Sequence, residues 1–179
     1  MKKVALISMA VLFSLTGIQR VQAQKALRNK QVYLEYFGPG VVSSASFDSR
    51  FKSGEALGFG YRAGLGFSIG IFVDDFFWHD KELIQLYLTF PLGLNYVFGK
   101  KGSPHACEIG AGATVLTRKV NLYNYEGSYK PGYFLGHLSF MYRRVPTDGG
   151  FTWRIGFNPM IGTAGDIIPS GAIGFGYAF

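Results

Sequence analysis

The chain has 179 residues, of which 25 are glycine, 17% aromatic and only 16% charged. This composition excludes intrinsic disorder and is richer in apolar and glycine residues than an ordinary water-soluble domain. The formal charge of the whole chain is +7. Lys2, Lys3 and Arg20 lie in the N-terminal segment discussed next, and without them 15 basic residues stand against 11 acidic residues, a net charge of +4. This smaller charge removes the compositional argument for nucleic-acid binding.

The first 23 residues have the pattern of a secretory signal peptide. Met1-Lys2-Lys3 is a short basic start, residues 4–17 form an apolar run, and Val21-Gln22-Ala23 places small residues at the −3 and −1 positions. We expect cleavage after Ala23, which would leave residues 24–179 as one exported domain. A single anchoring helix is the alternative, but the apolar run is shorter than the roughly 20 residues that cross a bilayer.

The remainder is predicted to form about eight β-strands, because segments of alternating apolar and small or polar residues are separated by turn residues. The expected strands, in chain order, span residues 31–37, 41–51, 57–69, 83–98, 106–117, 133–144, 151–161 and 171–179. No later apolar run would make a spanning helix, so a membrane location would require a closed barrel.

The alternation gives each strand an apolar outer face and a small or polar inner face. In strand 151–161, for example, the odd positions, Pro159 included, are assigned outward. Pro91 and Pro159 should produce local bulges, because proline removes a hydrogen-bond donor from the ladder. The only cysteine, Cys107, provides no disulfide partner, and we expect a buried structural thiol.

The connections alternate in length. Those at 52–55, 99–104 and 145–150 are short and should face the periplasm, whereas 70–82 and 118–131 are longer, 162–169 is intermediate, and these three should face outside the cell. We therefore predict an all-β fold: an antiparallel up-and-down transmembrane β-barrel with both termini in the periplasm. A soluble β-sandwich is the alternative, disfavoured because the glycines share a face with charged residues.

An eight-stranded barrel has room inside only for its own side chains or one small ligand. Alternation points six ionisable residues into this lumen, namely Glu35, Asp48, Arg50, Arg62, Glu108 and Arg154. Because an unpaired buried charge is costly, we expect three acids and three arginines to pair. A structural network that fills the lumen and fixes strand register is the preferred interpretation, and a proton or ion path is the alternative.

Two aromatic groups carry further hypotheses. The chain ends with alternating Phe175, Tyr177 and Phe179, which resembles the last-strand signal by which the barrel-assembly machinery recognises its substrates. The long connections present candidate contact residues for an extracellular partner, Phe76, Phe77, Trp78, Tyr123 and Tyr125.

The acids around His79 match no known cation-site spacing, so we expect neither a metal nor another cofactor.

Four short segments of the sequence are rich in glycine and aromatic residues. They are Val32-Tyr33-Leu34-Glu35, residues 60–66, residues 90–96 and residues 108–112. They resemble phrases of small outer-membrane barrels of Bacteroidetes-type bacteria, eight-stranded proteins of the OmpA/OmpX kind. The resemblance covers most of residues 24–179 and implies fold and location, but it supplies no activity.

A catalytic alternative comes from His137-Leu138-Ser139, which resembles the His-x-Ser element of outer-membrane lipid A deacylases. The resemblance implies a serine nucleophile with a histidine base. Here alternation points both side chains into the lumen, the residues after Ser139 depart from the deacylase pattern, and no orienting acid is assigned. We therefore expect a non-enzymatic barrel among outer-membrane lipids with a filled lumen and a structural or adhesive role, with a lipid-modifying enzyme and a narrow passive channel as alternatives.

Overall fold

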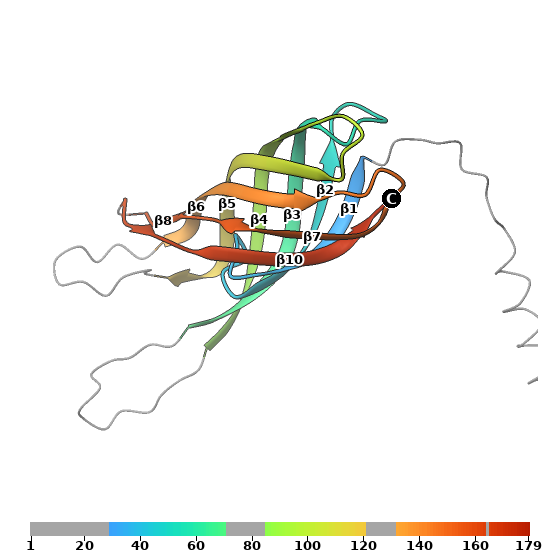
Figure 1. The fold of residues 1–179 in the computed structure, drawn as a ribbon. Helices are drawn as coiled ribbons and strands as arrows, with labels where there is room; N and C mark the ends of the chain where they lie inside the picture. The colour runs from blue at the N-terminus through green and yellow to red at the C-terminus, as the bar shows by residue number, and fades with distance from the viewer. Residues whose placement is uncertain (1–28, 71–84, 121–131, 164) are drawn as a thin grey trace, which may run out of the picture.

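The computed structural model describes residues 29–70, 85–120, 132–163 and 165–179 (Figure 1). Ten strand segments lie in these ranges: β1 Lys30–Tyr36, β2 Ser43–Arg50, β3 Gly58–Gly70, β4 Gln85–Gly99, β5 His105–Val120, β6 Gly132–Arg144, β7 Gly150–Phe157, β8 Met160–Ile161, β9 Ile167–Ile168 and β10 Gly171–Ala178. The same ranges contain no helix with the length and apolarity to cross a membrane. The predicted signal peptide, residues 1–23, lies outside the described residues.

The sheet is antiparallel throughout and closes on itself. Successive strands pair from β1 to β6, β6 pairs with β7 and β8, and β10 pairs with both β7 and β1. The closing pair is continuous, from Gln31 opposite Ala178 to Tyr36 opposite Ile173. The chain thus runs up and down around a barrel (Figure 1).

The ten segments make eight barrel strands, because two strands are each interrupted by a proline. Phe157 pairs with Gly171 and Met160 pairs with Ile168 in one register, which places Pro159 opposite Pro169. Neither proline has an N–H, so the ladder is interrupted there without the strands separating. Segments β7 and β8 form one strand, β9 and β10 another, and the predicted up-and-down barrel of about eight strands is confirmed.

The bulges predicted at Pro91 and Pro159 are wrong. The β3–β4 pairing keeps one register on both sides of Pro91, where only Gly64 and Leu65 drop out of it, and β6 likewise keeps one register across Pro159. Proline's fixed φ suits an extended strand, so a ladder can lose one bond without an inserted residue. The β5–β6 pairing instead shifts register between Val115 and Val120.

Side chains alternate as predicted between an apolar outer wall and a polar interior. In β3, for example, Phe59 is 67% exposed and Arg62 is 4% exposed. Two individual predictions are wrong. Cys107, which was expected to be buried, is exposed on the outer wall, because it lies two residues before Ile109 and therefore on the same face of the strand. Pro159, which was expected to face outward, is buried.

The two ends of the barrel differ. One end, here called the turn rim, holds the connections 51–57, 100–104 and 145–149 together with Asn29 and Phe179. The other, the loop rim, holds the β1–β2 connection, residues 37–42, together with residues 162–163 and 165–166. At the loop rim β3 and β4 stay paired as far as Gly70 and Gln85, whereas β2 has already ended opposite Phe67. The β3–β4 pair therefore projects beyond the rim (Figure 1).

Candidate functional site

The lumen holds a cluster of buried charged side chains from almost every strand. The structure brings together all six residues that alternation placed there, and it adds Arg143 from β6. Each of the seven is at most 4% exposed. Three carboxylates thus face four guanidinium groups, not the three that were predicted.

Glu108 on β5 is the centre of this lumen network. One carboxylate oxygen accepts from Arg62 and from Arg154, the latter at 2.6 Å, and the other oxygen accepts from Arg143 at 2.5 Å. The three arginines lie on β3, β7 and β6, so one carboxylate links four strands. Charge-assisted hydrogen bonds of this kind are the stronger class in proteins.

Asp48 on β2 is a second centre, nearer the turn rim. It accepts from Arg50 at 2.5 Å and from Arg143 at 3.3 Å. The amides of Gln31 and Asn95 donate to the same carboxylate at 3.1 and 2.5 Å. Arg143 therefore joins the Asp48 and Glu108 centres into one network.

Glu35 and Tyr33 connect β1 to the same network. Glu35 lies 3.2 Å from Nε of Arg154 and 3.8 Å from Nη1 of Arg62. The Arg154 guanidinium stacks over the Tyr33 ring at 4.6 Å from its centroid, which adds a cation–π contact. Together the three centres link β1 through β7, which is seven of the eight barrel strands.

The eighth strand makes room instead of supplying charge. On the lumen face of β10, a Cβ at Gly174 would lie 2.9 Å from Cγ of Arg154, and a Cβ at Gly176 would overlap Tyr33. The glycines are therefore what allows an arginine and a tyrosine to lie across a barrel of this width.

Arg143 is the network residue that sequence reasoning missed. Alternation along strand 133–144 had already pointed His137 and Ser139 inward, and Arg143 has the same odd parity. The signal was present, but Arg143 stands beside Arg144 at the end of the strand, where two adjacent arginines are easily assigned to a solvated turn. In the structure Arg143 is 3% exposed and buried in the lumen.

His137 and Ser139 both point into the lumen and are buried, as alternation predicted. The Nδ1 of His137 lies 3.4 Å from the Thr114 hydroxyl, which itself donates to the Pro39 carbonyl. The imidazole is thus held by a threonine rather than oriented by a carboxylate. Both residues face away from the outer wall, where a lipid substrate would lie, so the geometry does not assemble a deacylase site.

The remaining predicted residues divide into two groups. Phe175, Tyr177 and Phe179 lie exposed on the outer wall, with the backbone N–H of Phe179 bonded to the Lys30 carbonyl at 2.9 Å. The candidate contact residues Phe76, Phe77, Trp78, Tyr123 and Tyr125 lie outside the described residues. Within the described ranges, no three His, Cys, Asp or Glu side chains are placed to hold a metal ion.

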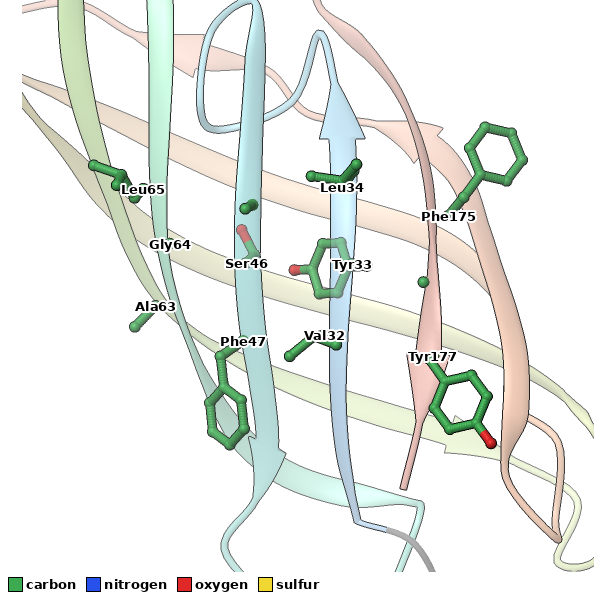
Figure 2. Close-up of a pocket in the computed structure, with 12 residues that line it drawn as sticks. Val32, Tyr33, Leu34, Ser46, Phe47, Ala63, Gly64, Leu65, Phe175 and Tyr177 are labelled. Carbon is green, nitrogen blue, oxygen red and sulfur yellow. The ribbon is translucent and has the colours of Figure 1, made fainter. Parts of the chain in front are cut away.

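A wide groove lies on the outer wall rather than in the lumen (Figure 2). It has a volume of about 730 Å³ and runs over β3, β2, β1 and β10, between ridges that include Phe47, Leu65 and Phe175. Ala45 and Ala63 form part of its floor. Most of the side chains that line the groove are apolar.

The turn rim carries a few exposed charges around a smaller hollow of about 320 Å³, which Lys100, Lys101 and Glu55 help to line. The ammonium of Lys52 donates to Glu55 at 2.6 Å, and this hydrogen bond lowers the pKa of the Glu55 carboxyl. Exposed pairs of this kind contribute little to stability.

Comparison with known proteins supports the fold. No protein-family model and no curated protein matches the chain. Among solved structures, the chain is similar to the N-terminal β-barrel domain of Pseudomonas aeruginosa OprF, with a TM-score of 0.53 and 14% identity over 88% of this chain and 100% of that one. At this identity the similarity shows the closed eight-stranded antiparallel barrel and extends to nothing finer.

Proposed function

We propose that this chain is an integral outer-membrane β-barrel, oriented with the turn rim in the periplasm and the loop rim outside the cell. The observation that carries the proposal is the inverted distribution of polarity. Charged side chains are buried inside, while large apolar residues such as Leu34, Phe59 and Leu94 are 52–67% exposed around the outer wall. Such a wall far exceeds the apolar patches that water-soluble monomers expose, and hydrocarbon is the solvent that suits it.

The test is membrane fractionation combined with a gel shift on heating. We expect the chain in the outer-membrane fraction, migrating differently before and after boiling because a folded barrel binds detergent differently from an unfolded chain. Recovery in the soluble periplasmic fraction would contradict the proposal.

Within that location, we propose a non-enzymatic role in membrane structure or in contacts made at the loop rim. The lumen network supports this, because its side chains fill the interior: the cavity beside Asp48, Arg50 and Arg143 has a volume of about 10 Å³, room for at most one water. The β3–β4 projection supports contact from the loop rim, since a paired ribbon that leaves the barrel presents strand edges to the outside.

Site-specific photocrosslinking in intact cells tests the contact role. A photoreactive residue in place of Leu86, which is 62% exposed at the loop rim, should give discrete crosslinked protein species. Phe98, exposed on the same strand near the turn rim, is the matched control and should give only lipid or background products. Equal products from the two positions would count against a loop-rim partner.

A further inference from the structure

The β1–β2 connection, Phe37–Val42, folds into the barrel instead of away from it. Pro39 is completely buried. The carbonyl oxygens of Pro39 and Gly40 accept hydrogen bonds from lumen-facing hydroxyls, from Thr114 at 2.6 Å and from Thr89 at 3.0 Å. Thr114 lies on β5, four strands from β1 in a barrel of eight, so the connection reaches across to the opposite wall.

An apolar layer receives the end of this connection. Val41 packs against a buried cluster of lumen side chains supplied by β4, β5, β6 and β8, namely Tyr87, Leu116, Leu135 and Met160. This apolar layer lies between the loop rim and the lumen network. A hydrophobic constriction excludes water and ions, so the outer end of the lumen is closed by different chemistry from the charged centre.

The backbone of the connection is held in a strained conformation. Phe37 has φ 58° and Val41 has φ 74°, in the left-handed region that β-branched and bulky residues avoid. Such residues cost about 1–3 kcal/mol each and persist only where surrounding contacts hold them. Here the contacts are the two threonines, the apolar layer, and the Ser170 hydroxyl, which donates to the Phe37 carbonyl. Two backbone hydrogen bonds within the connection add to them, from the Phe37 N–H to the Val42 carbonyl at 3.0 Å and from the Val41 N–H to the Gly38 carbonyl at 2.9 Å.

The two glycines of the connection leave no spare space. A Cβ at Gly38 would lie 2.7 Å from a Glu35 carboxylate oxygen, and a Cβ at Gly40 would overlap the Ser44 side chain. The connection therefore rests directly on Glu35, a member of the lumen network.

From this geometry we propose that Phe37–Val42 is a stopper that seals the lumen at the loop rim, and that releasing it admits water and small ions to the upper lumen. The proposal rests on the membrane location proposed above. The strain is the feature that makes release feasible: once the holding contacts are removed, the left-handed residues return to ordinary backbone angles and the connection leaves the lumen.

The test removes the two hydroxyl donors with little change of shape, in the double variant Thr89→Val/Thr114→Val. We expect amide hydrogen exchange at Phe37 and Val41 to rise at least tenfold, and the buried His137 imidazole, which lies beside Thr114, to become reactive toward a small water-soluble reagent such as diethyl pyrocarbonate. The control is Thr152→Val, an equally buried lumen threonine that bonds to Gln31 at 3.3 Å on the turn-rim side and should change neither measurement.

The heat-dependent gel shift separates the two proposals. A variant that keeps the shift is a folded barrel, so unchanged exchange at Phe37 and Val41 in that variant would overturn the stopper alone. If the double variant does not fold, Val41→Thr serves in its place, because threonine keeps the β-branched shape and its left-handed strain while it places a hydroxyl against the apolar layer. Released amides without any gain in His137 reactivity would also overturn the seal.

Discussion

At the scale of single residues, Glu108 is the acid that pairs with three of the four arginines in the lumen network. Replacement by glutamine keeps its size but leaves three guanidinium groups facing a neutral amide, in a lumen where only two acids remain for four arginines. Removing one partner from a buried ion-pair cluster costs about 3–5 kcal/mol. We expect Glu108→Gln to lower the free energy of unfolding by that order, measured by urea titration of the refolded protein in micelles.

Glu55→Gln is the matched control for this substitution. It changes the same functional group, in an exposed pair with Lys52 at the turn rim, and should leave the urea midpoint where it is. If the urea midpoint of Glu108→Gln equals that of the wild type, the lumen network does not contribute to the stability of the barrel.

Gly176 offers a steric test on the opposite side of the lumen. An alanine methyl there would overlap the Val32 carbonyl and the Tyr33 side chain, whereas the nearest atom to a methyl at Gly171, on the same strand, is 3.7 Å away. We expect Gly176→Ala to destabilise the barrel by about 1–3 kcal/mol, as overpacking does, and Gly171→Ala to be tolerated. Equal urea midpoints for the two variants would show that β10 is free to move.

Residue-level prediction from the sequence succeeded where parity alone decides. Alternation points Glu35, Asp48 and Glu108 inward without any knowledge of tertiary structure, because successive strand side chains take opposite sides. It could not show which acid pairs with which arginine. Those contacts cross the lumen between strands far apart in the chain, and they depend on strand stagger and side-chain length.

At the scale of the element, strand identity was predictable and strand ends were not. Phe37 and Val41 are apolar residues at the ends of the expected strands 31–37 and 41–51, so they were assigned to strands, but both lie in the β1–β2 connection and have positive φ values. No local sequence pattern predicts that a phenylalanine or a valine will adopt the left-handed backbone conformation. The surrounding lumen imposes that conformation, and it is also what turns the connection inward.

The last element, β10, carries the prediction about assembly. Its outward aromatics end at Phe179, whose backbone N–H bonds to Lys30 beside the β1–β10 closure. If the aromatic end is the feature recognised during insertion, deleting Phe179 should lower the amount of barrel in the outer membrane of expressing cells severalfold. Folding of the purified variant in detergent should change little, since Phe179 adds a single backbone hydrogen bond at the end of the β1–β10 ladder.

The two measurements together isolate recognition from stability. Ile173→Ala in the same strand is the control, because it removes an outward apolar side chain without touching the terminus. Normal insertion of the Phe179 deletion would contradict the signal, and a loss of folding in detergent would assign the residue to stability instead.

At the scale of the whole molecule, the barrel itself could be predicted because two independent patterns agree: the period-two alternation and the alternation of connection lengths. The filled interior needed more. Sequence indicates that the lumen contains charge, but Arg143, the inward connection and the apolar layer at the loop rim emerge only when strands distant in sequence are brought around one axis. Together they change a barrel with some charge inside into one closed at two levels.

That closure leads to a prediction for the intact protein. The lumen network spans seven strands, and the apolar layer with Val41 covers its outer end, so no continuous water-filled path is expected through the described barrel. The wild-type chain, refolded and inserted into planar bilayers, should show no regular unitary current steps. Insertion is verified by protease protection of the same bilayer preparation, so that a lack of current from inserted barrels is distinguished from a failure of the protein to insert. Reproducible steps of uniform size from verified wild-type barrels would mean that the network and the stopper open together on the timescale of the recording, and the passive-channel alternative would then replace the closed barrel.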